Sequence, residues 1–453
     1  MDLTTWTARA VDAVQAWQAD AGRFDPHPAL DVDDQRLANA LAELTDRLGD
    51  NYPFHHPRYA GQMLKPPHPV AVVGYLATML INPNNHALDG GPATARMEKE
   101  VVADLARMFG LEQHLGHLTS SGTIANLEAL FVARELHPDR GIAYSADAHY
   151  THARMCHLLG VTPTSVATDD AGRMDLAALR DVLAAGRVGT VVATAATTGL
   201  GAVDPIDEIV ALAREHGVRV HVDAAYGGFF RLLASDEPDA RGGVRPAPWR
   251  AIAAADSVVV DPHKHGLQPY GCGAVLFADP AVGRFYDHDS PYTYFTSDEL
   301  HLGQISLECS RAGAAAAAMW LTLQVFPLTR DGLGAVLAAG RRAAVDWHDR
   351  LERSAVLRPY VRPEVDIVTY LPRLASASAV DQASAAMLAR GMADELDPVY
   401  LSTLRVSADR LSRVCGGVEA DVDQACILRS VLLKPESETT IEWLHARVES
   451  LAR

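Results

Sequence analysis

The middle of the chain alternates between short apolar runs and longer amphipathic segments. Between about residues 90 and 325 the runs are rich in β-branched residues, and the segment PIDEIVALAREHG (205–217) has the spacing of a helix. Apolar runs that alternate with helices are typical of a largely parallel sheet covered on both faces. The pattern therefore predicts an α/β fold. The predicted strands are GIAYSA (141–146), GTVVATAAT (189–197), VRVHVDAAY (218–226), DSVVVDP (256–262) and GAVLFA (273–278).

The two ends of the chain differ from this middle part. Residues 1 to about 60 have a helical pattern and end in a stretch rich in proline and histidine. Residues 331–353 predict a long connecting helix, and three later apolar runs predict a small sheet packed with helices. The pattern thus predicts a helical N-terminal segment (1–60), a large domain (61–330), and a connecting helix with a small α+β domain (331–453).

The composition is that of an ordinary globular protein, with 453 residues, 48% hydrophobic and 21% charged. The net charge of −17 argues against nucleic acid or an anionic membrane as the main partner. Five scattered cysteines form no CxxC pair, so the sequence indicates no disulfide framework and no zinc site. The N-terminus resembles an amphipathic helix more than a signal peptide, and the most apolar stretch is short for a bilayer. We therefore expect a cytoplasmic protein of the size of an enzyme, without a membrane partner.

Side chains with catalytic potential follow several predicted strands. Asp223 ends one strand, Thr198 follows a second, and His149 comes after a third. Lys264 lies in the turn between two buried runs, where an ammonium group is costly unless it is paired or used in chemistry. Because the carboxyl ends of parallel strands meet at one edge of a sheet, we expect these groups to gather there. A lysine after a strand is usually a solvated loop residue, so the argument depends on the combination.

The stretch SSGT (120–123) stands directly before a strongly helical run. Small hydroxylic residues and glycine at a helix start leave N–H groups free at the positive end of the helix dipole, which suits a phosphate. Pyridoxal phosphate (PLP) needs such a cradle, an amine for its aldehyde, a carboxylate for its ring nitrogen and a flat group on its ring. Lys264, Asp223 and His149 supply the last three, so the residues together indicate PLP.

These segments resemble the group II PLP-dependent amino acid decarboxylases, which include glutamate and aromatic amino acid decarboxylases. The resemblance covers roughly residues 55 to 330 and implies a large domain of PLP fold-type I, similar to aspartate aminotransferase. It also implies a tight homodimer and the α-decarboxylation of an L-amino acid with release of CO2. The motifs that carry it, in chain order, are SSGTIANLEAL, DAHYTHARM, ATAATTGLGAVDPI, HVDAAYGG, DPHKHG and ECSRAGAAAAAMW.

The resemblance implies a role for each matching cofactor residue. Lys264 would bind the cofactor covalently, Asp223 would pair with the ring nitrogen, and Ala225 would pack on the ring face opposite His149. Many relatives have Asn or Ser at the position of Asp261, so the acid there is a departure from the family pattern. The remaining residues implied around the cofactor are Ser121, Gly122, Thr123, Thr198, His263 and, across a dimer interface, Ser310.

The resemblance also places residues near the substrate. The region 81–91, with Asn84 and His86, is expected to border the substrate, and Arg429 either meets a carboxylate or braces the C-terminal domain through an ion pair. Tyr292 and Tyr294 are candidates for the acid that protonates Cα, and interface packing is the alternative for both.

The histidines at 149, 152 and 157 suggest a metal-binding spacing, but no carboxylate or thiolate completes a site, so we expect no metal.

Two other functions remain open from the sequence. The same cofactor site serves carbon–carbon lyases and enzymes that couple decarboxylation to oxidation or transamination, and these differ at only one or two side chains. A non-catalytic PLP-binding protein is the second alternative, but it would have no need to keep Lys264, Asp223 and His149 together. The motifs do not identify the amino acid substrate.

Overall fold

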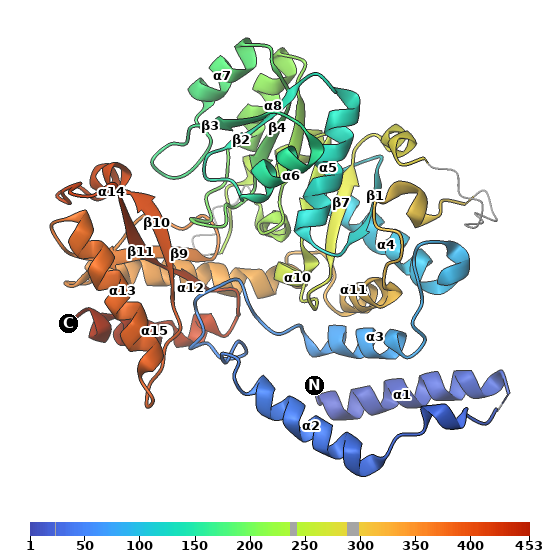
Figure 1. The fold of residues 1–453 in the computed structure, drawn as a ribbon. Coiled ribbons are helices and arrows are strands. Elements are labelled where there is room, and N and C mark those ends of the chain that lie inside the picture. Colours follow the sequence, from blue (N-terminus) through green and yellow to red (C-terminus); the bar gives the residue numbers. More distant parts are fainter. Residues whose placement is uncertain (23, 236–241, 288–298) are drawn as a thin grey trace.

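The computed structural model describes residues 1–22, 24–235, 242–287 and 299–453 (Figure 1). A seven-stranded sheet forms the centre, in the order β1-β7-β6-β5-β4-β2-β3. Strand β7 runs antiparallel to both its neighbours, and the other pairs are parallel, which confirms the predicted fold class. The strands are β1 (Leu115–Thr119), β2 (Gly141–Ser145), β3 (Pro163–Val166), β4 (Val188–Thr194), β5 (Arg219–Asp223), β6 (Ser257–Val260) and β7 (Gly273–Phe277).

Helices cover both faces of this sheet, as the nearly unbroken apolar runs require. Val258 and Val260 face the core beneath α4 and α8, whereas Val259 between them faces α5. The helices of this part are α3 (Pro69–Met79), α4 (Pro92–Phe109), α5 (Gly122–Leu136), α6 (Thr151–Leu159), α7 (Leu176–Ala184), α8 (Ile206–Glu215), α9 (Pro246–Ala251), α10 (Pro262–His265) and α11 (Gly313–Val325).

A second, antiparallel sheet has the order β10-β11-β9-β8. Three of its strands were predicted from apolar runs, and the short fourth strand, β8, was not predicted. Trp347 of α12 and Tyr370 of β9 are fully buried between this sheet and its helices. The elements are α12 (Leu333–Arg353), β8 (Leu357–Pro359), β9 (Ile367–Pro372), α13 (Ala377–Ala393), β10 (Ser402–Ser407), α14 (Ala408–Cys415), β11 (Gln424–Val431) and α15 (Ser437–Ala452). The domain boundaries at 60 and 330 stay predictions.

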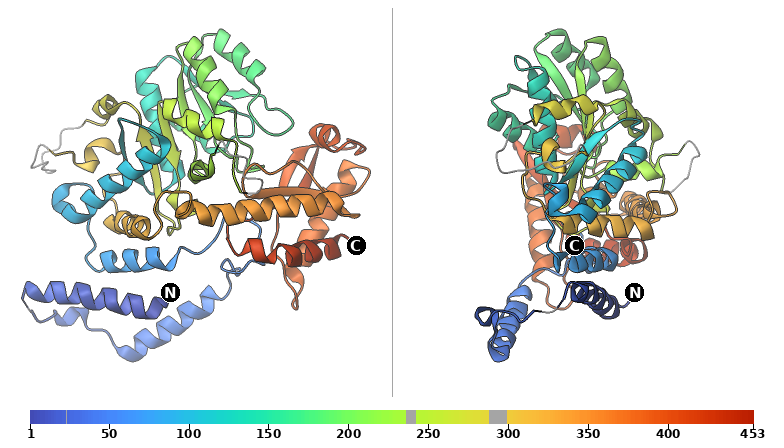
Figure 2. Two further views of the ribbon diagram at one scale, coloured as in Figure 1. Left: turned by 180° about the vertical axis from the view of Figure 1, so that it is seen from behind. Right: turned by 90° about the vertical axis from the view of Figure 1, so that its right-hand side faces the viewer.

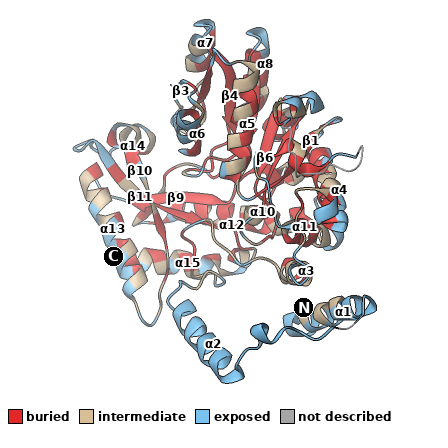
Figure 3. Cartoon of the chain, turned by 45° about the vertical axis from the view of Figure 1, so that its right-hand side comes forward, coloured by how far each residue is buried: buried red, intermediate tan, exposed pale blue. Residues whose placement is uncertain are grey.

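The N-terminal helices α1 (Leu3–Asp20) and α2 (Asp34–Leu48) stand apart from both sheets (Figures 2 and 3). Neither helix has a buried residue. Leu37, Leu41, Leu44 and Leu48 of α2 are each more than half exposed, and their spacing places them on one helix face. This face is apolar yet has no cover in the single chain. No helix in the described ranges combines the length and apolar composition needed to cross a membrane.

Candidate active site

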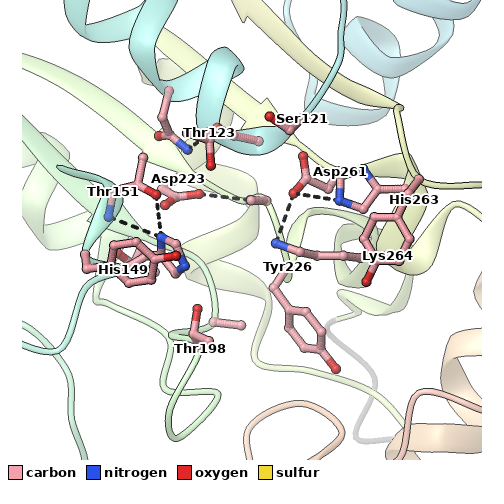
Figure 4. Close-up of a pocket in the computed structure, with 17 residues that line it drawn as sticks. Ser121, Thr123, His149, Thr151, Thr198, Asp223, Tyr226, Asp261, His263 and Lys264 are labelled. Atoms are coloured by element: carbon pink, nitrogen blue, oxygen red, sulfur yellow. Dashed lines mark hydrogen bonds and ion pairs between the residues drawn. The ribbon is translucent and has the colours of Figure 1, made fainter. Parts of the chain in front are cut away.

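A pocket of about 430 Å³ opens at the carboxyl edge of the large sheet, beside the ends of β4, β5 and β6 (Figure 4). Open α/β sheets bind ligands at this edge because loops and helix starts converge there. Segments far apart in the sequence thus meet around one cavity, as predicted from the strand ends. The predicted residues that line it are Ser121, Gly122, Thr123, His149, Thr198, Asp223, Ala225, Asp261, His263 and Lys264.

Helix α5 begins at the wall of the pocket. Ser121 caps the helix, since its Oγ accepts a hydrogen bond from the backbone N–H of Ile124 at 3.3 Å. The first N–H groups of a helix have no partner within it, and the helix dipole favours an anion at this end. A Cβ on Gly122 would lie 2.5 Å from Asp261 Oδ2, so only glycine fits between the helix start and that carboxylate. The helix start is therefore suited to a phosphate group.

Lys264 lies in the single turn α10 between the antiparallel strands β6 and β7. Its Nζ is 3.0 Å from Asp261 Oδ2, and the Asp261 side chain is only 3% exposed. Burial lowers the pKa of Lys264, but the nearby Asp261 and Asp223 carboxylates, Asp261 foremost, help to raise it above its usual value. The ion pair explains how this core tolerates an ammonium group. The other oxygen of Asp261, Oδ1, is buried without a hydrogen-bond partner.

We expect Asp261→Asn to make the Lys264 amine more reactive in the cofactor-free protein. The neutral amide removes the charge that raises the lysine pKa, while burial still lowers it, so more free amine is present at a given pH. Labelling with an amine-specific reagent, followed by mass spectrometry, should show faster modification, by about tenfold for each unit of pKa lost. Lys99, which lies 3.9 Å from Glu299, is the internal control. Equal Lys264 rates in both proteins would contradict this role of Asp261.

Asp223 ends β5 with its carboxylate held by two donors. Oδ1 accepts a hydrogen bond from the backbone N–H of Ala225 at 3.1 Å, and Oδ2 lies 2.9 Å from His152 Nε2. Burial alone would raise the Asp223 pKa, but the His152 hydrogen bond and the charge of Lys264 outweigh it and place the pKa well below its usual value. Asp223 is therefore a buried carboxylate that stays ionised at the wall of the pocket.

His149 and Thr198 lie on one side of the pocket, with Lys264 on the other (Figure 4). The His149 Nδ1 is 2.6 Å from Thr151 Oγ1, and its ring lies 4.2 Å from that of Tyr150. Burial lowers the His149 pKa, so the imidazole is neutral at physiological pH. A flat, neutral ring held in this way is suited to stack on an aromatic cofactor.

Arg429 of β11 braces the loop that carries Thr198. Its guanidinium donates to the backbone carbonyls of Thr198 at 2.6 Å and of Gly199 at 3.0 Å. Of the two roles that the sequence left open, these contacts favour the brace, although it acts through carbonyl groups and not through an ion pair. Arg429 is not among the described residues that line the pocket.

Three further predicted residues lie outside the lining of this pocket in the described part of the chain. Asn84 Nδ2 donates to Ser310 Oγ at 3.0 Å, and the backbone N–H of His86 donates to Asn84 Oδ1 at 3.0 Å. Ser310 instead lines a separate hollow of about 230 Å³. Tyr292 and Tyr294 fall outside the described residues. The predicted cofactor and substrate contacts of Asn84, His86, Ser310, Tyr292 and Tyr294 stay predictions.

Several residues near the cofactor site were missed from the sequence, and His152 and Tyr270 are the two with the clearest contacts. His152 was interpreted only as part of a metal-like spacing, although it lies three positions after His149, in the first turn of α6. Tyr270 lines the pocket, its hydroxyl donates to the Met63 carbonyl at 3.2 Å, and its ring lies 4.9 Å from His263. Its position six residues after Lys264 was the available signal.

The residues present fit PLP. The α5 start offers N–H groups for the phosphate, and Gly122 lets the backbone come close. The ionised Asp223 and the amine of Lys264 lie on the same cavity, as the ring nitrogen and the aldehyde require. The orphaned Oδ1 of Asp261 shows that the pocket still holds unused hydrogen-bonding capacity.

Comparisons with known proteins agree with this site. Residues 53–356 match the family model described as the pyridoxal-dependent decarboxylase conserved domain. An L-tyrosine decarboxylase of Levilactobacillus brevis is 26% identical over 477 residues, covering 80% of this chain and 76% of that protein. An L-aspartate decarboxylase of Thermococcus kodakarensis is 28% identical over 337 residues, covering 73% and 83%.

Solved structures share the fold. Mouse CSAD has a TM-score of 0.80 at 20% identity, covering 98% of this chain and 92% of that one. Oryza sativa TDC, solved with PLP and tryptamine, has a TM-score of 0.80 at 17% identity, covering 100% and 97%. The family match spans most of the chain and includes every element that builds the pocket. The chain therefore belongs to the pyridoxal-dependent decarboxylase family, and it is a PLP-dependent amino acid decarboxylase.

Proposed function

We propose that this decarboxylase converts an aromatic L-amino acid, such as L-tyrosine, to its amine and CO2. A hollow of about 460 Å³ shares His149, Tyr150 and Thr198 with the cofactor pocket, and it has apolar walls from Leu200 and Leu404. This hollow supports the proposal because an aromatic side chain gains from apolar contact there. The names of relatives include both tyrosine and aspartate decarboxylases, so aspartate is the competing substrate.

The cations around this hollow do not favour an acidic side chain. Arg410 lines it, but its Nη1 is 2.7 Å from Asp147 Oδ2, which neutralises it. Arg405 also lines it, but Leu404 of the same strand packs against Gly199, and successive strand residues point to opposite faces. A substrate carboxylate placed here would have to compete with Asp147 for Arg410 or reach Arg405 at the rim, whereas an aromatic side chain would meet the apolar walls directly.

The pocket residues divide the work of decarboxylation. When bound, PLP supplies an electron sink for the bond that breaks at Cα. We assign Lys264 to the aldehyde, Asp223 to the ring nitrogen and the α5 start to the phosphate. Neutral His149 would stack on one face of the ring and orient the leaving carboxylate by a hydrogen bond, and Ala225 would cover the other face. The acid that protonates Cα is Tyr292 or Tyr294, with His149 as the alternative.

The proposal is tested by supplying the purified enzyme and PLP with L-tyrosine, L-phenylalanine, L-aspartate and L-glutamate in separate reactions. We expect CO2 and amine in equal amounts, with kcat/KM for L-tyrosine about tenfold or more above that for L-aspartate, because the tyrosine ring gains apolar contact that the short acidic side chain does not make. A preference for L-aspartate would contradict the aromatic assignment. Ammonia, hydrogen peroxide or a carbonyl product in place of the amine would show a coupled oxidation or transamination.

We further propose that the protein is a cytoplasmic homodimer. The uncovered leucine face of α2 supports self-association, since a row of four exposed leucines is unusual on a monomer. The five free cysteines suit a reducing compartment. Equilibrium sedimentation should give about twice the chain mass of 48.7 kDa, and cell fractionation tests the compartment. A monomeric mass would contradict the dimer.

A further inference from the structure

His152 lies directly behind Asp223, on the side away from the cavity. It belongs to the first turn of α6, its side chain is fully buried, and it is not among the residues that line the pocket. Its Nε2 is 2.9 Å from Asp223 Oδ2, and its ring lies 5.9 Å from the ring of Tyr144 on β2. The imidazole therefore has one strong polar contact, and that contact is with the residue assigned to the cofactor's ring nitrogen.

The two ring nitrogens of His152 have different surroundings. Because Asp223 Oδ2 belongs to an ionised carboxylate, it accepts, and His152 Nε2 donates. The other nitrogen, Nδ1, is buried without a hydrogen-bond partner. The ring therefore acts on Asp223 through its Nε2–H group.

The next buried imidazole adds no charge behind the carboxylate. His221 lies between Asn126 Oδ1 at 3.0 Å and Ser257 Oγ at 2.9 Å. Burial lowers its pKa to about 3, so it is neutral at physiological pH. The donors that hold Asp223 are therefore the Ala225 N–H at Oδ1 and His152 at Oδ2.

We propose that His152 is a positioning residue for PLP, which orients the Asp223 carboxylate toward the ring nitrogen. The backbone N–H of Ala225 holds Oδ1 and His152 holds Oδ2, so the carboxylate cannot rotate away from the cavity. A hydrogen-bond donor behind a carboxylate that holds a bound group fixes the orientation of that carboxylate. The proposal rests on the assignment of Asp223 to the ring nitrogen.

The test compares His152→Phe with His152→Gln. Phenylalanine keeps the ring beside Tyr144 but has no donor, and glutamine places an amide N–H near the position of Nε2. Titration of the cofactor-free proteins should show PLP bound roughly 10- to 100-fold more weakly by the Phe variant, the value of a hydrogen bond to a charged group. With 15N-labelled PLP, the ring nitrogen resonance should move toward the unprotonated position. The Gln variant should bind PLP within about threefold of the wild type and should keep the 15N resonance near the wild-type position.

Controls distinguish a failure of this proposal from a failure of the assignment of Asp223 to the ring nitrogen. Thermal unfolding of the cofactor-free variants checks the fold, and if the Phe variant does not fold, His152→Asn replaces it, because its shorter amide does not reach Oδ2. Asp223→Asn must itself shift the 15N resonance; if it does not, the assignment of Asp223 has failed. A different outcome would overturn the proposal itself: Asp223→Asn shifts the 15N resonance, but His152→Phe (or His152→Asn) has the PLP affinity and the 15N resonance of the wild type. His152 would then have no positioning role. Equal losses in the Gln and Phe variants would also overturn the proposal.

Discussion

Asp223→Asn should lower kcat by about a thousandfold or more, while the protein still folds and binds PLP. Asparagine keeps the shape of the side chain but not its charge, so the ring nitrogen loses its proton and PLP becomes a poor electron sink. The effect is expected to be large because the native carboxylate is buried and its pKa lies well below its usual value, so the charge is present at every working pH. Steady-state CO2 release measures the loss.

A matched control shows whether that loss is local. Asp181→Asn, on the exposed side of the outer helix α7, removes one negative charge far from the pocket and should leave kcat unchanged. Equal unfolding midpoints for both variants would place the effect in the chemistry. Near-normal turnover of the Asp223 variant would mean that the ring nitrogen has another partner.

Replacing Lys264 should lower turnover by several powers of ten, because the covalent link to the aldehyde has no other amine in the pocket lining of the described residues. Lys264→Arg is the better variant, since it keeps a cation beside the buried Asp261 carboxylate. Lys264→Ala would also leave that carboxylate unpaired and lose stability. Both variants should lack the visible absorbance of covalently bound PLP. Turnover within tenfold of the wild type would contradict the assignment.

The sequence predicted strands that are continuous apolar runs and missed two strands of the large sheet that are not, β1 and β3. Strand β1 contains Gly116 and His117, which break the apolar pattern, yet His117 is buried because its Nε2 is 2.9 Å from Glu128 Oε2. A polar pair that is satisfied inside a core leaves no periodic signal. Strand β3 lies at the sheet edge, with Pro163 and Ser165 exposed, so it has no hydrophobic alternation to detect.

The site was predictable for a different reason. Asp223, His149 and Lys264 follow strands directly, so the sheet topology alone brings them to one edge. Contacts between distant parts of the chain were not predictable in the same way. Arg429 meets the Thr198 carbonyl only because the small sheet packs on the loop after β4, and the His152 contact with Asp223 depends on how α6 packs against β5. Sequence spacing carries no record of such packing.

The central claim is that this chain holds PLP covalently through Lys264. Borohydride reduction of the holoenzyme, followed by proteolysis and mass spectrometry, tests it most directly. Reduction fixes the cofactor to whichever amine carries it, so the modified peptide identifies the residue without any assumption about the substrate. The account predicts one phosphopyridoxyl group per chain, on Lys264. A group on another lysine, or no modified peptide at all, would contradict it.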